Sequence, residues 1–276
     1  MKQVKILNVP IDNLSKLELL AKLRAGGIVF TTNVDHLMKL QNDQDFYQAY
    51  MVATYRVCDS QIIKYAANFL NTPIQEKISG SDFFPAFCKY YQNDEEIKVF
   101  LLGSAEGVAT QAKKNINKKV GRKIVVGAYS PSFSFENSEA ESQKIIDLIN
   151  QSGATVLAIG VSAPKQEVWL RRYYHRCKQI RIFMGIGATI DFEAGCCQRA
   201  PKWMRDIGLE WFHRLMSAPR RLWKRYLVED IPFFWLLLLQ KFNLYQNPFT
   251  EELKTSILPP DTGQYAVVRK RIIAKR

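Results

Sequence analysis

The feature of this chain that most constrains its fold is the regular alternation of short apolar runs with amphipathic stretches. Runs of strand length and strand composition cover residues 2–9, 27–32, 56–59, 98–103, 123–129, 155–160 and 181–185. Patterns with helical spacing cover residues 14–24, 105–119, 138–151 and 164–176. Apolar strands that alternate with helices are typical of an α/β fold, because the crossover helices cover both faces of a parallel sheet. We therefore expect an α/β core with a largely parallel sheet.

The pattern changes after Gly195. Residues 200–245 lose the strand signals and become helical, basic and rich in Trp and Phe. Prolines fall near the expected starts of helical runs, where proline is tolerated, at Pro201, Pro219 and Pro232. We expect three short helices here, and the whole chain divides into a core over 1–198, a helical appendage over 199–245, and a linker with a basic tail over 246–276.

The net charge of +13 is unevenly distributed along the chain. Residues 199–276 carry 15 Lys and Arg against 7 Asp and Glu, so the last quarter supplies more than half of the excess. A basic end predicts an anionic partner, which is a nucleic acid, an anionic lipid surface or a phosphorylated substrate. The longest apolar run, residues 231–239, is far shorter than the roughly 20 residues that span a bilayer. We see no signal-peptide pattern at the start of the sequence and expect any membrane association to be peripheral.

Metal-binding patterns are weak. The five cysteines have no zinc-ligand spacing, and the histidines His36, His175 and His213 are scattered. The segment Asp43-Gln44-Asp45 has the D-x-D spacing that can hold a metal–diphosphate, but its polar setting between helical segments favours a solvated helix start. The sequence therefore predicts reduced thiols, no bound metal and no cofactor.

Ligands of parallel sheets bind beyond the carboxyl ends of the strands, so the strand-to-loop junctions are the expected sites. The junction at 31–36 gathers hydrogen-bonding groups, including Thr31 and Asn33, although Thr32 or Asn33 could equally cap a helix. At the next junction, Asp59 could act as a general base, because inverting sugar transfer needs one carboxylate to accept the proton of the acceptor hydroxyl. Its alternative role is a cap for the helix expected at 61–70.

Three further segments suit the approach of phosphate or ribose. A glycine-containing turn opens a helix near residue 82 and can bind an anion, through Lys77, Gly80, Ser81 and Asp82. Segments 101–107 and 185–191 follow apolar strands with glycine and small or polar residues, which makes candidates of Gly103, Ser104, Gly187 and Asp191. Neither segment completes the G-x-G-x-x-G fingerprint of dinucleotide sites, and ordinary turns explain all three equally well from residue type.

Taken in order, these segments resemble the WecG/TagA/CpsF family of glycosyltransferases from about residue 29 to residue 239. The shared markers are T-x-N at 31–33, the Asp at 59, G-S-D at 80–82, L-L-G-S at 101–104, I-G-V-S-A-P-K-Q-E at 159–167, G-I-G-A-T-I-D-F-E-A-G at 185–195, R-A-P-K-W at 199–203, G-L-E-W-F-H-R-L at 208–215 and P-R-R-L-W-K-R-Y-L at 219–227. The A-P-K-Q-E and R-A-P…G-L-E-W…R-L series are the most specific of these.

The resemblance implies a Rossmann-like core with a C-terminal helical appendage, and a metal-independent, inverting transfer. The implied donor is a UDP-sugar such as UDP-N-acetylmannosamine, and the implied acceptor is N-acetylglucosamine on undecaprenyl diphosphate. Such an enzyme makes cell-envelope polysaccharide at the cytoplasmic face of the membrane, as a peripheral protein. Its expected partners are the UDP-sugar, the polyprenyl-diphosphate-linked saccharide and an anionic membrane surface. A homo-oligomer is compatible with the sequence, and no nucleic acid is expected.

The resemblance also implies residue roles. By position, Asp59 matches the catalytic base and Asp191 a nucleotide contact near the uracil. The matching pocket residues are Thr31, Asn33 and Gln166, with Lys165 beside them in the same motif. Lys77 stands where some members have arginine. The cations that close over the diphosphate are Arg214, Arg221 and Arg225.

The spacing of these three arginines agrees with that role. Positions seven and four apart share one helical face if the helices continue in phase, and we see no obvious acidic partners within the segment. Cations of this kind can neutralise a leaving diphosphate in place of a metal. The aromatic residues beside them are typical of an interfacial amphipathic helix, and equally of a helix packed onto the core.

Two other classes stay open from composition. A basic nucleic-acid-binding α/β protein would explain the charge, although the chain has no evident helix-turn-helix or RNA-binding motif. A Rossmann oxidoreductase would explain the alternating pattern, but the missing glycine fingerprint weakens it.

Overall fold

The computed structural model describes residues 2–249, and up to Tyr245 they form one compact unit. Its centre is a six-stranded parallel sheet with the strand order β4-β3-β8-β7-β5-β6. The strands are β3 (Gly27–Thr32), β4 (Tyr55–Cys58), β5 (Val99–Gly103), β6 (Val125–Tyr129), β7 (Val156–Gly160) and β8 (Ile182–Gly185). Each lies within one residue or two of a predicted run, and the prediction of a parallel α/β core is confirmed.

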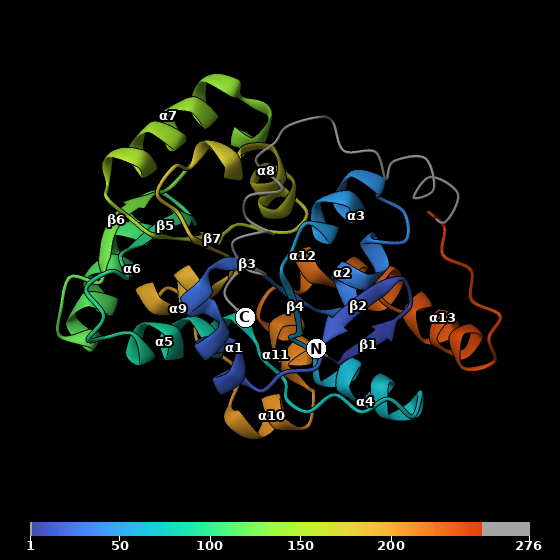
Figure 1. Ribbon diagram of the computed structural model, residues 1–276. Coiled ribbons are helices and arrows are strands. Elements are labelled where there is room, and N and C mark those ends of the chain that lie inside the picture. Colours follow the sequence, from blue (N-terminus) through green and yellow to red (C-terminus); the bar gives the residue numbers. More distant parts are fainter. Residues whose placement is uncertain (1, 250–276) are drawn as a thin grey trace. The chain divides into compact units, whose positions relative to one another are not determined.

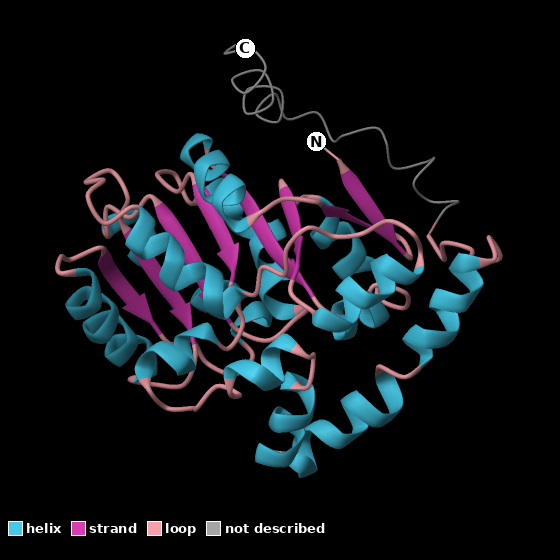
Figure 2. Ribbon diagram, turned by 90° about the horizontal axis from the view of Figure 1, so that it is seen from below, coloured by secondary structure: helices cyan, strands magenta, loops and turns pink. Residues whose placement is uncertain are grey.

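Helices cover both faces of this sheet (Figures 1 and 2). One layer contains α1 (Lys16–Lys22), α5 (Gly80–Tyr90), α6 (Val108–Val120) and α9 (Thr189–Ala194). The opposite layer contains α2 (Val34–Lys39), α3 (Gln44–Met51), α7 (Glu139–Gln151) and α8 (Lys165–Tyr173). Short 3₁₀ turns follow or precede some of these helices, at Leu23–Ala25, Phe135–Asn137 and Tyr174–Arg176. Helix α4 (Gln61–Phe69) contacts the N-terminal hairpin.

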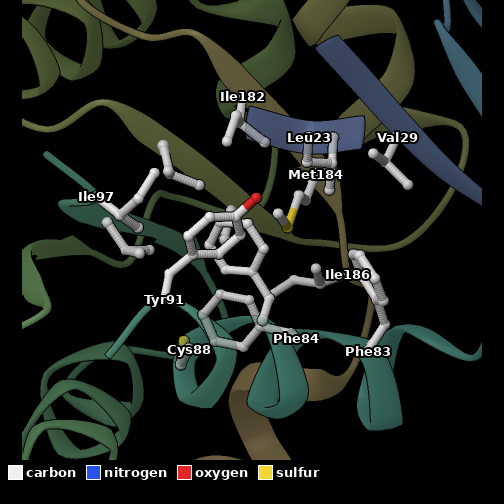
Figure 3. Close-up of a cluster of buried hydrophobic side chains, with 14 of the residues drawn as sticks. Leu23, Val29, Phe83, Phe84, Cys88, Tyr91, Ile97, Ile182, Met184 and Ile186 are labelled. Carbon is white, nitrogen blue, oxygen red and sulfur yellow. The ribbon is translucent and has the colours of Figure 1, made fainter. Parts of the chain in front are cut away.

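The central strands β5, β7 and β8 are apolar along their whole length because both of their faces are buried. Val29 and Met184 point toward the α5 layer, where they pack with Phe83 and Phe84 (Figure 3). Alternate residues such as Phe30 point to the other layer, and all of these side chains are almost fully buried. The amphipathic helices close this core from both sides, so local pattern and tertiary packing agree.

The prediction of a single strand over residues 2–9 is wrong. The chain folds there into an antiparallel hairpin, β1 (Gln3–Ile6) and β2 (Val9–Asp12), which forms a separate two-stranded sheet. Leu7 takes a left-handed conformation with φ 54°, which is uncommon for a residue with a Cβ. Its burial and a 2.7 Å hydrogen bond from its N–H to Oε1 of Gln240 hold the turn, and neither contact can be seen in the local sequence.

The appendage has more helices than predicted. It contains α10 (Lys202–Asp206), α11 (Glu210–Ser217), α12 (Pro219–Lys224), a π-helical turn (Arg225–Glu229) and α13 (Pro232–Lys241). Pro219 and Pro232 occupy first turns and Pro201 directly precedes α10, as predicted. The additional helix is α11, which begins just after Gly208. Within residues 2–249, no helix is both long and apolar enough to cross a membrane.

The predicted division at residues 198 and 245 stays a prediction. Most of the predicted linker and basic tail, from residue 250 onward, lies outside the described residues.

Candidate active site

A cavity of about 320 Å³ opens at the carboxyl ends of β3 and β4, between the core and the appendage. The predicted site residues that line it are Asn33, Asp59, Lys77, Arg214 and Arg225. Other charged or aromatic residues that line it are Asp35, Arg205, Glu210, Trp211, Tyr226, Asp230 and Phe234. The cavity therefore joins acidic groups from two strand ends with cations and aromatic rings from the appendage.

Asp59 follows β4 directly and is half-buried on the cavity wall. Its N–H donates a 2.8 Å hydrogen bond to the carbonyl of Thr32, which extends the pairing of β3 and β4 by one residue. The helix behind it is capped by Ser60, whose hydroxyl accepts from the N–H of Ile63. The alternative role of Asp59 as a helix cap is therefore wrong, and its carboxylate faces the cavity.

The environment of Asp59 makes it a stronger base than an ordinary aspartate. Burial raises the pKa of this carboxyl to about 7, and the negative charge of Glu210 acts in the same direction. Three groups act in the opposite direction and lower the pKa. They are the positive charge of Arg214, a hydrogen bond from the Thr31 hydroxyl, and the positive charge of Lys77. A carboxylate with a pKa near the working pH is suited to accept a proton during a reaction.

The junction after β3 caps a helix and also reaches the cavity. Asn33 caps α2, since its side-chain oxygen accepts a 2.9 Å hydrogen bond from the N–H of His36, and it also lines the cavity. The hydroxyl of Thr31 donates a hydrogen bond to the carboxylate of Asp59. On the opposite side of the strand, the hydroxyl of Thr32 lies 2.8 Å from that of Tyr50. The end of β3 is thus held rigid beside the carboxylate.

Arg214 and Arg225 both reach the cavity, and each has an acidic partner. Nη2 of Arg214 lies 2.8 Å from Oε1 of Glu210, one turn earlier in α11. Nε of Arg225 lies 3.4 Å from Oδ1 of Asp35, and its guanidinium stacks 5.3 Å from the ring centre of Tyr226. The expectation that these cations lack acidic partners within their own segment is therefore wrong for Arg214.

Arg221 does not line the cavity and is exposed on α12. The helical conformation is interrupted between α11 and α12, at Ala218 and Pro219, so positions 214 and 221 belong to different helices. The expectation of one arginine face is wrong for this reason, because the spacing rule holds only within a continuous helix.

Asp230 lies at the end of the cavity beside Arg225 and Asp35. Burial raises the pKa of Asp230 to about 7, Arg225 opposes this shift, and Asp35 adds to it. Its Oδ1 atom is buried and has no hydrogen-bond partner among the described residues. This end of the cavity therefore holds a carboxyl group that can still bind a hydroxyl or a proton.

The turn at 77–82 is occupied by the chain's own groups. Asp82 accepts hydrogen bonds from Arg199 at 2.6 Å, from Arg205 at 3.1 Å and from Ser79 at 2.6 Å. Burial would raise the pKa of Asp82, but these three partners hold it well below its usual range. Asp82 thus attaches the start of the appendage to α5. Gly80 approaches the carbonyl of Ile186 so closely that a Cβ would lie 3.1 Å from its oxygen.

Of the four residues predicted at this turn, Lys77 reaches the cavity and donates a 2.9 Å hydrogen bond to the carbonyl of Arg205. Gly80, Ser81 and Asp82 do not line the cavity. Their direct contact with substrate stays a prediction.

The two glycine-containing loops meet at the carboxyl ends of the central strands. The hydroxyl of Ser104, which follows β5, donates a short hydrogen bond to the carboxylate of Asp191 in α9. Ser104 has φ 64°, and Gly103 is so close to Gly160 that a Cβ would lie 2.4 Å from its carbonyl oxygen. Gly187 has open space where a Cβ would be. These residues form a second polar surface, outside the cavity of Asp59.

Lys165 and Gln166 lie at the start of α8. Nζ of Lys165 lies 2.7 Å from Oε1 of Glu136 and 4.2 Å from the ring centre of Phe133. Gln166 is buried against Gly185 and donates a 2.7 Å hydrogen bond to Glu167, while its Oε1 has no hydrogen-bond partner in the part of the chain that the structure describes. An open acceptor atom of this kind is suited to bind a sugar hydroxyl or amide.

Across residues 2–249, no group of three or more His, Cys, Asp or Glu side chains could hold a metal ion. Asp43 caps α3 through a 2.9 Å hydrogen bond from Phe46, and Asp45 is exposed, as expected for a solvated helix start. His36 is a core residue, and burial lowers its pKa to about 3. The five cysteines are free.

The sequence profile of the glycosyl transferase WecG/TagA/CpsF family matches residues 4–247. The chain belongs to this family. It is similar to a protein of Bacillus subtilis (strain 168), N-acetylglucosaminyldiphosphoundecaprenol N-acetyl-beta-D-mannosaminyltransferase, with 25% identity over 235 residues, 84% of this chain and 88% of that protein. The enzyme is therefore a glycosyltransferase, which decides against the oxidoreductase and nucleic-acid-binding alternatives.

Several residues of this glycosyltransferase cavity were missed by the sequence analysis. Asp35 lies in the same junction as Asn33, and Glu210 lies in the G-L-E-W motif, so both had a local signal. Tyr226 lies in the P-R-R-L-W-K-R-Y-L motif, so it also had a local signal. Asp230 had none, because only the turn between α12 and α13 directs it inward.

Proposed function

We propose that this glycosyltransferase moves N-acetylmannosamine, or a closely related sugar, from a UDP donor to N-acetylglucosamine on polyprenyl diphosphate. The transfer proceeds with inversion and serves the synthesis of cell-envelope polysaccharide. Family membership and the name of the Bacillus subtilis relative support the substrates. The observation that carries the proposal is the half-buried Asp59 on a cavity that also contains Arg214 and Arg225.

In the proposed reaction, Asp59 accepts the proton of the acceptor hydroxyl. The hydroxyl oxygen attacks the anomeric carbon of the donor sugar from the face opposite the nucleotide. The bond between that carbon and the phosphate oxygen breaks, and its electron pair leaves with UDP. A well-placed general base contributes a factor of roughly 10²–10⁴ to such a rate.

The leaving diphosphate needs positive charge, and Arg214 and Arg225 would supply it. Guanidinium groups form two parallel, charge-assisted hydrogen bonds with phosphate oxygens. In the free enzyme, Glu210 and Asp35 hold these guanidinium groups at the cavity. We propose that the diphosphate shares or replaces these carboxylates and that no metal takes part.

The donor would lie across both polar surfaces. We propose that Ser104 and Asp191 bind the nucleoside, with Gly103 and Gly187 allowing close approach of the backbone. Near the sugar, the proposed contacts are Thr31, Asn33 and Gln166, with Lys165 supporting the start of α8. We assign no direct contact to Arg221, because it lies outside the cavity.

The appendage exposes many large apolar side chains beside its cations. These exposed residues are Trp203, Ile207, Phe212, Met216, Trp223, Leu227, Val228, Ile231, Phe234, Trp235, Leu238, Phe242 and Leu244. We propose that this surface docks on an anionic membrane at its cytoplasmic face, where each nearby cation contributes about 1 kcal/mol. Docking would place the cavity next to the lipid-linked acceptor.

A donor screen tests the proposed reaction. The full chain is mixed with a synthetic polyprenyl-diphosphate N-acetylglucosamine acceptor and with each of several UDP-hexosamines and UDP-hexoses, and the released UDP is measured. We expect release with UDP-N-acetylmannosamine or a close relative. Asp59→Asn should lower turnover roughly 10²–10⁴-fold, while Asp45→Asn, at an exposed carboxylate, should not. No acceptor-dependent release from any donor would contradict the proposal.

A further inference from the structure

Glu210 brings a carboxylate of the appendage into the cavity beside Asp59. It is the first residue of α11, and its side chain is only 23% exposed. Its Oε1 lies 2.8 Å from Nη2 of Arg214, and all three side chains line the same cavity. The carboxylate of Asp59, which belongs to the core, therefore faces the ion pair of Glu210 and Arg214, which both belong to the appendage.

The charges around Asp59 come from both parts of the molecule. The core contributes Lys77 and the hydroxyl of Thr31, and α11 contributes Glu210 and Arg214. Two carboxylates in a poorly solvated space repel each other, which favours the protonated form of the more buried one. Arg214 would cancel this repulsion if it paired with Asp59, but its hydrogen bond goes to Glu210.

The other arginines of the cavity have acidic partners other than Asp59. Arg205 pairs with Asp82. At the other end of the cavity, Arg225 pairs with Asp35, and it is also the strongest charged neighbour of Asp230. Among the acidic groups, Glu210 acts most strongly on Asp59.

We propose that Glu210 is a positioning residue for the base: by facing Asp59 with a second carboxylate and by holding Arg214, it lets the appendage set how strongly Asp59 binds the proton of the acceptor. This inference rests on the proposed function, in which Asp59 is that base. It follows that both the core and the appendage contribute to the base. The side chain that accepts the proton belongs to the core, and its strength depends on α11 lying against the end of β4.

The strength of a base matters to the rate in two ways. A stronger base removes a proton more readily, but it must be ionised at the working pH. An aspartate beside Glu210 meets both conditions from neutral pH upward, since burial and Glu210 raise the pKa of Asp59 to about 7. An aspartate with an ordinary pKa would be ionised over a wider range of pH but would be a weaker base.

The variant Glu210→Gln tests this role. It keeps the shape of the side chain and an oxygen for Arg214, but it removes the charge. We expect the acid limb of the profile of kcat/KM against pH to move to lower pH, and the plateau rate at alkaline pH to fall several-fold. A ¹³C NMR titration of the Asp59 carboxyl in the full chain, assigned with Asp59→Asn, should show the same downward movement without any turnover.

Glu229→Gln is the matched control. Glu229 lies on the same appendage, is exposed, pairs with Lys224 at 3.5 Å and does not line the cavity. The Glu229→Gln variant removes the same charge and should leave both the pH profile of kcat/KM and the titration of Asp59 unchanged. Glu210→Asp keeps the charge and should restore the acid limb toward that of the unaltered chain.

Each contrary result would disprove one particular claim. If Glu210→Gln lowers turnover equally at every pH and leaves the Asp59 titration in place, the inference is wrong and Glu210 is only structural. Equal movement in Glu229→Gln would also overturn it, as a general effect of charge. If Asp59→Asn instead keeps its turnover, the proposed base itself is wrong, whatever Glu210 does.

Discussion

Nε of Arg225, at the start of the π-helical turn, lies 3.4 Å from Oδ1 of Asp35, in the first turn of α2. Asp35 also lies 2.9 Å from Nζ of Lys39, so one nearly buried carboxylate serves two cations. This contact joins the appendage to the strand end that carries the proposed sugar-binding residues. It both fastens the appendage and places a cation at the cavity.

We expect Asp35→Asn to lower the free energy of unfolding by about 1–3 kcal/mol, because it removes a nearly buried charge that pairs with both Lys39 and Arg225. Glu229→Gln breaks the exposed pair with Lys224 and should cost about 0–1 kcal/mol. Urea denaturation of both variants at pH 7 measures the difference. Equal losses would show that the Asp35 contact is no stronger than a surface ion pair.

The stability of Asp59→Asn should depend on pH. Between about pH 4 and pH 7 the folded Asp59 keeps a proton that the unfolded chain has released, because folding raises its pKa to about 7. Asp59 therefore destabilises the fold increasingly as pH rises through this window, and asparagine does not.

We expect the Asn variant to match the unaltered chain at pH 4 and to be more stable at pH 8, by the order of 1–3 kcal/mol. Thermal unfolding at the two pH values measures this, with Asp45→Asn as an exposed control. A constant difference would mean that Asp59 has no raised pKa in the folded chain.

Asp191→Ala should weaken the binding of UDP without unfolding the protein. A charge-assisted hydrogen bond contributes about 1.5–3 kcal/mol, so we expect the Kd for UDP to rise about 10- to 100-fold. Isothermal titration calorimetry measures this change. Glu106→Ala, at an exposed carboxylate of the Ser104 loop, is the matched control. Unchanged binding in Asp191→Ala would place the nucleoside elsewhere.

Two aromatic residues of α13 should separate membrane docking from folding. Trp235 is 63% exposed and Phe233 is fully buried. We expect Trp235→Ala to reduce sedimentation with anionic vesicles while turnover on a short-chain soluble acceptor stays normal. Phe233→Ala should lower the free energy of unfolding by about 3–5 kcal/mol. Unchanged vesicle binding in Trp235→Ala would argue against docking through this face of the helix.

Activity should be independent of divalent cations, because Arg214 and Arg225 line the cavity and, in the proposed reaction, neutralise the leaving diphosphate. We expect the same initial rate in excess EDTA as in added magnesium, measured as UDP release. A complete loss in EDTA that magnesium restores would show that the two arginines do not suffice.

The sequence by itself determined the architecture of the core. Strands such as β5 and β7 are apolar at every position, and a helix that is apolar on one face follows each of them. Such patterns depend on near neighbours in the chain, so they predict elements and their order. The same order brings the strand ends together, and for this reason Asp59, Ser104 and Asp191 could be named as candidates before any contact was known.

Only the tertiary structure decided which charged groups meet. Arg214 and Arg221 have the same residue type and a helical spacing, yet a break at Pro219 directs only Arg214 into the cavity. The turn at Leu7 likewise depends on Gln240, more than two hundred residues away. The pKa of Asp59 depends on a carboxylate from another part of the chain. Burial and electrostatic interactions depend on which groups lie close together in space, whereas the periodicity of a sequence reports only on neighbours along the chain.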